Sequence, residues 1–152
     1  MKSGKKNISV NGPDYDSSIK LQHNSHVPYF QVAVSFHLSI LGKWKFNLAI
    51  SAEIILEYEE IIQHKYGIST ANAFIALLKE LPNVHYITSY YKWQLINADP
   101  DDNKYCDCAI AGKASFLVTE DKHFSILKKI PFPKLTTISI EDFVIMLRHT
   151  ST

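Results

Sequence analysis

Six acidic residues lie between Asp99 and Asp121, in the stretch DPDDNKYCDCAIAGKASFLVTED. Its first acids open a predicted helix, and Asp107 interrupts a run of small apolar residues one turn further on. Asp121 follows a short apolar run at 115–118 that is typical of a strand. A helix start can hold a carboxylate at its N-cap, and the loop after a parallel strand lies where ligands bind. We therefore expect Asp102, Asp107 and Asp121 to meet at one place.

Carboxylates that lie this close repel one another unless a hard cation such as Mg²⁺ or Mn²⁺ shares them. Each acid also has a purely structural alternative. Asp102 would serve as a helix N-cap, Asp121 would cap a helix that starts near Lys122, and Asp107 would pair with Lys104 on the helix surface. Asp107 fits its alternative least well, because an acid among small apolar neighbours is costly to bury without a partner. Taken together, the acids favour a metal site.

Strands alternate with helices along most of the chain, and this pattern predicts an α/β fold. We expect a three-layer sandwich in which one central, mostly parallel sheet lies between helices, with the runs 46–50 and 115–118 in that same sheet. The predicted strands are 46–50, 84–88, 115–118 and 136–140. The predicted helices are 29–41, 53–66, 69–81, a helix that opens at Asp102, 122–129 and 141–148.

The clearest of these helices runs from Glu53 to Tyr66, between Ser51 as its N-cap and Gly67 as its stop. Its buried face is predicted from residues that share one arc at 100° per residue: Ile54, Tyr58, Ile61 and Ile62. Glu57 and Glu59 lie at the two edges of that arc. Periodicity alone does not choose between these two acids as a functional residue.

The whole chain of 152 residues is expected to be one domain, since it contains no repeat, linker or low-complexity tract. Residues 1–28 are atypical because they lack a hydrophobic period, and we expect them to be poorly ordered or loosely packed. Lys and Arg number 16 against 15 Asp and Glu, so net charge gives no argument for nucleic-acid binding. The absence of a signal peptide or membrane-length apolar run predicts a cytoplasmic protein without a membrane partner.

Three segments resemble the PIN domain, the ribonuclease fold shared by VapC-type toxins and related bacterial proteins. They are SAEIILEYEEII (51–62), the acidic stretch 99–121, and TTISIEDFVIML (136–147). The chain is most similar to the branch that contains toxin components of toxin–antitoxin systems. The resemblance begins near Phe46 and covers roughly two thirds of the chain.

This resemblance implies an endoribonuclease that cleaves RNA phosphodiesters with water activated by Mg²⁺ or Mn²⁺. The implied metal ligands and catalytic residues are Glu57, Asp102, Asp107 and Asp121. Thr119 and Asn103 take supporting positions. The same comparison selects Glu57 over its neighbour at position 59. The implied partners are RNA, an antitoxin protein and a second copy of the chain.

The chain departs from the family at its N-terminus. PIN domains begin with an apolar strand that ends in Asp-Thr-Asn or a close variant, and that aspartate is a principal metal ligand. Here Ile8–Val10 is followed by Asn-Gly-Pro, and neither Asp14 nor Asp16 has a strand before it. No residue takes the place of the first ligand. The alternative function is therefore a catalytically degenerate PIN-like module that binds a protein partner or RNA without cleaving it.

Overall fold

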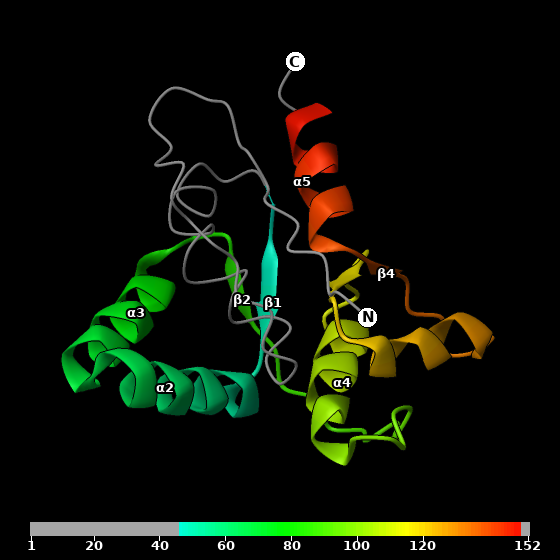
Figure 1. The fold of residues 1–152 in the computed structure, drawn as a ribbon, viewed down its shortest axis with the longest axis horizontal. Helices are drawn as coiled ribbons and strands as arrows, with labels where there is room; N and C mark the ends of the chain where they lie inside the picture. Colours follow the sequence, from blue (N-terminus) through cyan, green and yellow to red (C-terminus); the bar gives the residue numbers. More distant parts are fainter. Residues whose placement is uncertain (1–45, 150–152) are drawn as a thin grey trace, which may run out of the picture.

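A computed structural model describes residues 46–149 of the chain (Figure 1). The expectations for residues 1–28 and for a helix at 29–41 lie outside this range, as do Asp14 and Asp16. The elements in chain order are β1 (Leu48–Ile50), α2 (Ala52–Tyr66), α3 (Ile68–Glu80), β2 (Val84–Tyr86), the 3₁₀ helix η1 (Pro100–Asp102), α4 (Asn103–Ala111), β3 (Leu117–Val118), the 3₁₀ helix η2 (Lys122–Lys129), β4 (Thr137–Ile138) and α5 (Ile140–His149).

The strands are short and form two separate parallel pairs. Strand β1 pairs with β2, so that Leu48 lies opposite Val84. Strand β3 pairs with β4, so that Leu117 lies opposite Thr137. Parallel pairing across helical connections confirms the predicted α/β class.

The single central sheet is not confirmed. The runs 46–50 and 115–118, which we expected in one sheet, contribute to two different two-stranded sheets. Within residues 46–149, the backbone hydrogen bonds of β1 go to the β2 side and those of β3 to the β4 side, and none joins β1 to β3. The three-layer sandwich around one sheet is therefore not what these residues form by themselves.

Helix α2 begins and ends where local signals predict. The Ser51 side chain accepts a hydrogen bond from the Ile54 backbone N–H at 3.3 Å, which satisfies a donor of the first turn. Gly67 follows the helix with φ at 89°, a conformation that favours glycine, and its N–H donates to the Gln63 carbonyl. The predicted apolar arc is confirmed for the residues that are fully buried on this helix: Ile54, Tyr58 and Ile62.

Helix α3 returns along α2, and the two helices lie side by side in Figure 1. The rings of Tyr58 and Phe74 meet edge to face, with centroids 6.2 Å apart. Such a pair adds specific geometry to the burial of apolar surface between two helices. Helix α2 begins directly after β1, so the hairpin formed by α2 and α3 is attached to the first sheet.

Helix α4 packs directly on the first sheet at its C-terminal end. A Cβ at Gly112 would lie 3.1 Å from the Ala49 Cβ and from the Ile87 Cγ1, which is tighter than most Cβ contacts, so this approach favours glycine. The same helix carries Cys106 and Cys108, both free and buried. Helix α4 therefore has one side against the first sheet and several side chains inside the core.

One hydrophobic core connects the two sheets despite their separation. It contains Ile50 from the first sheet and Leu117 from the second, together with Tyr58, Tyr105 and Phe124 from the surrounding helices. None of the helices formed by residues 46–149 combines the length and the apolar character needed to cross a bilayer. The candidate site lies where α4, the loop after β3 and the N-terminal half of α2 approach one another.

Candidate metal centre

The acidic turn before α4 is organised by Asp99. Its carboxylate accepts a hydrogen bond from the Asp101 N–H at 3.2 Å and caps η1, with Pro100 as the first helical residue. Asp102 ends η1 and leads into α4, but its side chain makes no capping hydrogen bond there. The structural alternative for Asp102 as an N-cap is therefore wrong, and its carboxylate is left for another partner.

The loop after β3 brings a second carboxylate to the same place. The Thr119 hydroxyl accepts from the Asp121 N–H at 3.0 Å. Asp121 in turn accepts from the His123 backbone N–H at 2.8 Å, which confirms the expectation that it caps the following helix. Thr119 is buried, so its hydroxyl fixes the path of the loop from the protein interior.

His123 joins the two acids. Its Nδ1 lies 3.5 Å from the Asp102 Oδ2 and 3.4 Å from the Asp121 Oδ1. Among the described residues, Asp99, Asp102 and His123 offer ligand atoms that all lie within 4.8 Å of one another. The structure thus brings Asp102 and Asp121 together, as expected, around a histidine that the sequence analysis missed. The available signal was the spacing Thr-x-Asp-x-His, which puts His123 on the same loop as Asp121.

The electrostatics of the cluster favour a bound proton or cation. Burial raises the pKa of the Asp102 carboxyl, and the negative charges of Asp99 and Asp121 raise it further. His123 opposes this shift, and the resulting pKa is about 6 instead of the usual 3.8. A carboxylate with this environment is more stable when a positive charge is supplied nearby.

Asp107 and Asn103 lie one helical turn apart on α4 and hold the loop that precedes the helix. The Asp107 Oδ1 accepts from the Trp93 N–H at 2.9 Å, and the Asn103 Oδ1 accepts from the Ile96 N–H at 2.8 Å. The Asn103 amide also donates back to the Ile96 carbonyl. Asn103 therefore supports the site by fixing this loop to α4.

Glu57 reaches α4 from α2. Its Oε2 accepts from the Tyr105 hydroxyl and lies 2.8 Å from the Lys104 Nζ. Lys104 is thus the ion partner of Glu57, and the expected surface pair between Lys104 and Asp107 is wrong. Glu57 and Asp107 are not part of the closely spaced group around His123, so the convergence of all four predicted acids stays a prediction.

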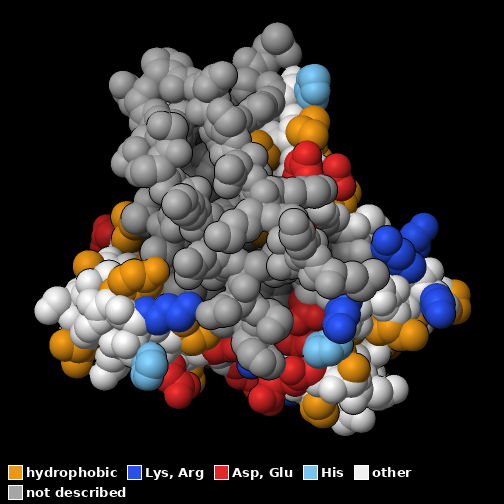
Figure 2. All heavy atoms as spheres, in the orientation of Figure 1, with side chains coloured by type: hydrophobic (Ala, Val, Ile, Leu, Met, Phe, Trp, Pro, Cys, Tyr) orange, Lys and Arg blue, Asp and Glu red, His pale blue; other side chains and the backbone are white. Residues whose placement is uncertain are grey.

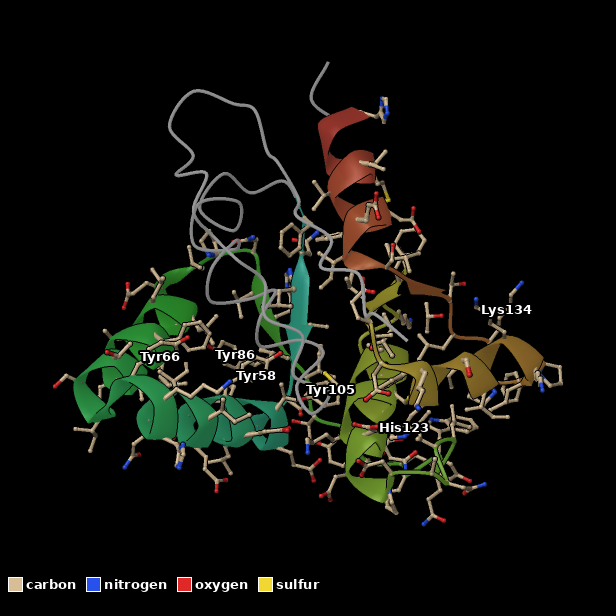
Figure 3. The ribbon with its side chains drawn as sticks, viewed as in Figure 1. Tyr58, Tyr66, Tyr86, Tyr105, His123 and Lys134 are labelled. Carbon is tan, nitrogen blue, oxygen red and sulfur yellow. The ribbon has the colours of Figure 1, made fainter. Side chains whose placement is uncertain are left out.

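Figure 2 shows Asp and Glu side chains gathered on the face over the adjoining ends of α2 and α4, with a histidine beside them. In Figure 3, Tyr105 lies between α2 and α4, and His123 lies beside α4 near the start of η2. The acids of α2, α4 and the β3–η2 loop therefore share one side of the molecule.

Three buried polar atoms in this region lack a hydrogen-bond partner within the described part of the chain: Asp102 Oδ2, Asp107 Oδ2 and His123 Nδ1. Buried polar atoms are normally paired, so each of them calls for an explanation. A divalent cation fits this set, because carboxylate oxygens suit Mg²⁺ and Mn²⁺ and an imidazole nitrogen suits Mn²⁺ better than Mg²⁺. Asp99, Asp102 and His123 offer the closely spaced ligand atoms, and the Asp121 Oδ1 lies 3.4 Å from the His123 Nδ1.

The chain was compared with known protein families, curated proteins and solved structures. The PIN domain family matches residues 25–123, well over half of the chain, and this range includes Glu57 and the whole centre around His123. No curated protein matches the chain, and no solved structure does. The fold of PIN domains is generally that of a metal-dependent nuclease, and these domains commonly act on RNA. The chain belongs to the PIN domain family.

Proposed function

We propose that this PIN domain is an endoribonuclease that depends on Mn²⁺ or Mg²⁺. The observation that carries the proposal is the approach of Asp102 and Asp121 to His123, together with buried oxygens that have no hydrogen-bond partner among residues 46–149. Carboxylates gathered around one point, with a buried oxygen left over, favour a cation there. The family match supports a nuclease as the use of that cation.

In this proposal some residues hold the metal ion and others fix the positions of the acidic side chains. The chemistry that a bound divalent ion supplies is activation of a water molecule and neutralisation of charge on the attacked phosphate. Asp102, Asp121 and His123 would hold the ion. Glu57 is fixed against α4 by Lys104 and Tyr105 through its Oε2, which leaves its Oε1 for a ligand. Asp107 has its Oδ2 available in the same way.

The finer assignment is a cytoplasmic toxin that is held inactive by an antitoxin protein. It rests on the similarity of the segments 51–62, 99–121 and 136–147 to the toxin branch of the family. In this proposal RNA is the substrate, and a second copy of the chain is a further candidate partner. Growth arrest on induction, relieved by a neighbouring gene product, would support the toxin role.

The test of the nuclease proposal is cleavage of single-stranded RNA by the purified full chain in Mn²⁺, Mg²⁺ or EDTA. We expect cleavage with a divalent ion, none in EDTA, and none for Asp102→Asn or Asp121→Asn prepared in parallel. Asp142→Asn, at an exposed acid of α5, is the matched control and should cleave like the wild type. RNA that is bound but left intact by the wild type under every metal condition would instead favour the degenerate binding module.

A further inference from the structure

Three aromatic side chains form a continuous cluster that is joined to α4 through Asp107. The ring centroids of Tyr91 and Trp93 are 4.7 Å apart, and those of Trp93 and Phe132 are 5.8 Å apart, in both cases with edge-to-face geometry. Tyr91 is 64% exposed and Phe132 is 78% exposed. We call these three residues the aromatic cluster. Edge-to-face packing of rings that are this exposed leaves ring faces open to a ligand.

The aromatic cluster is fixed to the site by a direct hydrogen bond. Trp93, its central residue, donates its backbone N–H to the Asp107 Oδ1 at 2.9 Å. Ile96 lies three residues after Trp93, and Asn103 holds both its N–H and its carbonyl. Three hydrogen bonds to two residues of α4 therefore set the position of the central ring relative to the helix that follows Asp102. A ligand on these rings would lie next to the metal centre.

Positive charge accompanies the rings. Lys128 and Lys129 end η2, and Lys134 follows Phe132 by two residues; all three are exposed. None of them makes an ion pair within the part of the chain that the structure describes. Figure 2 shows basic and hydrophobic side chains together at this end of the molecule, and Figure 3 places Lys134 beyond η2. The chain is nearly neutral overall, so this positive charge is local.

Open aromatic faces with nearby free cations match the chemistry of unpaired nucleic acid. Bases that are not paired stack on aromatic side chains, while lysines attract the phosphates. A base inside a duplex is already stacked and does not present its face. A purely apolar partner would explain the rings but not the exposed lysines at 128, 129 and 134.

We propose that Tyr91, Trp93 and Phe132 form a base-stacking subsite that binds an unpaired segment of RNA next to the metal centre. Lys128, Lys129 and Lys134 contact its phosphates. This inference rests on the proposed function for its choice of RNA as the ligand. It deepens that function by making unpaired bases, rather than duplex, the part of the substrate that the protein recognises.

Binding is measured in EDTA, so that the result does not depend on cleavage. The probe is a short fluorescein-labelled oligouridylate, followed by anisotropy, with the full chain and single substitutions. We expect Tyr91→Ala and Phe132→Ala each to weaken binding by about tenfold or more. Tyr66→Ala is the matched control, because Tyr66 is 59% exposed and ends α2, an element that carries none of the three rings. All variants are first compared by thermal unfolding.

Two further measurements identify the contacts. Stacking should quench the fluorescence of Trp93, and the quench should disappear in Trp93→Phe while Trp44 remains as the second tryptophan of the chain. The triple change of Lys128, Lys129 and Lys134 to Gln should flatten the dependence of binding on salt. The double change of Lys65 and Lys79 to Gln, on α2 and α3, should leave that dependence unchanged.

The outcomes separate this inference from the nuclease proposal. Ring-dependent binding without cleavage in any metal would leave the subsite standing and reject the nuclease. Metal-dependent cleavage by Tyr91→Ala and Phe132→Ala variants that bind like the wild type would reject the subsite alone. Equal binding of a duplex RNA would overturn the assignment to unpaired bases. No binding of the oligouridylate at all would also overturn it.

Discussion

Asp107 shows how one side chain can serve both the scaffold and the site. One of its oxygens accepts the N–H of Trp93, while the other is buried without a hydrogen-bond partner among the described residues. Its side chain is almost completely inaccessible, at 1% exposure. The first oxygen holds the loop with or without a ligand, whereas the second is expected to bind only when a ligand is present.

Replacement of Asp107 by Ala should therefore cost more than replacement by Asn. Asp107→Ala leaves the Trp93 N–H without its acceptor, and we expect a loss of about 1–3 kcal/mol in the free energy of unfolding. Asp107→Asn keeps an oxygen that can accept the same bond and should lose less. Urea unfolding in EDTA, followed by tryptophan emission, measures both. Equal losses in the two variants would show that this bond does not hold the loop.

The raised pKa of Asp102 makes stability depend on pH in a specific direction. The folded protein binds this proton with a pKa of about 6, while the unfolded chain has the usual 3.8. The resulting stabilisation is present below about pH 4 and is lost as the pH rises through about 6. Asp102→Asn, which cannot ionise, should be more stable than the wild type at pH 7 in EDTA. The difference should shrink toward pH 4.

Thermal unfolding across this pH range provides the measurement, and Asp142→Asn, at an exposed acid, is the control. That control should show no gain at pH 7 that fades toward pH 4. A wild-type protein that is as stable at pH 7 as Asp102→Asn would mean that the burial of Asp102 carries no penalty.

The histidine in the centre predicts a preference among metals. Because imidazole suits Mn²⁺ better than Mg²⁺, His123→Ala should weaken Mn²⁺ binding more than Mg²⁺ binding. A tenfold loss of affinity lowers the stabilisation by a saturating ion by about 1.4 kcal/mol. Melting temperature in a titration of each ion provides the readout. Equal losses for both ions would place His123 outside the ligand set.

At the level of elements, α4 is the part of the molecule to which the others attach. Gly112 lets it approach the first sheet, Glu57 links it to α2 through Lys104 and Tyr105, and Asn103 holds the preceding loop. Each contact lies at a different point along the helix. A displacement of α4 would therefore disturb the acids on several elements at once.

The close approach at Gly112 gives the test of this arrangement. A Cβ there would meet the Ala49 side chain, the Ile87 side chain and the Cys108 carbonyl, each at 3.1 Å. Two of these neighbours belong to the sheet or the backbone, so Gly112→Ala should destabilise the protein by about 1–3 kcal/mol. It should also weaken metal binding, which depends on the position of α4. Ser115→Ala, at an exposed residue of the same turn, should change neither property.

The features predicted correctly from the sequence are those set by neighbouring residues. Ser51 and Gly67 mark the ends of α2 because capping is decided within one helical turn. The partner of Lys104 was wrong for the opposite reason. Spacing along α4 suggested Asp107, three residues away, but the fold brings Glu57 from α2 closer. Contacts between elements are decided by packing, which local spacing does not contain.

The division into two sheets was missed for a related reason. Each strand is recognisable by its apolar run, but the edge with which it pairs depends on long-range contacts. The site was partly predictable because Asp102 and Asp121 lie on turns whose positions follow from strand and helix boundaries. His123 was not selected because a single histidine at the start of a predicted helix carries no signal of its own. Its role depends on the distances to two acids from different elements.

For the molecule as a whole, the notable property is the separation of charge in a nearly neutral chain. Acids gather over the ends of α2 and α4, while free lysines extend from η2 toward Lys134 (Figures 2 and 3). A phosphate chain would be attracted by the lysines and repelled by the acids until a cation is bound. We therefore expect Mn²⁺ to strengthen RNA binding as well as to permit cleavage.

The two buried cysteines of α4 can report the rate at which this helix leaves the core. Burial is the largest cause that raises the pKa of Cys106 to about 12 and that of Cys108 to about 11, so both remain thiols at neutral pH. An alkylating reagent needs an exposed thiolate and can react only when α4 leaves its place in the core. Modification of the native protein should be slow, and Mn²⁺ should slow it further. Mass spectrometry of the alkylated chain would measure the rate of this opening without any added label. Fast modification in native buffer would show that α4 does not hold the two sheets together.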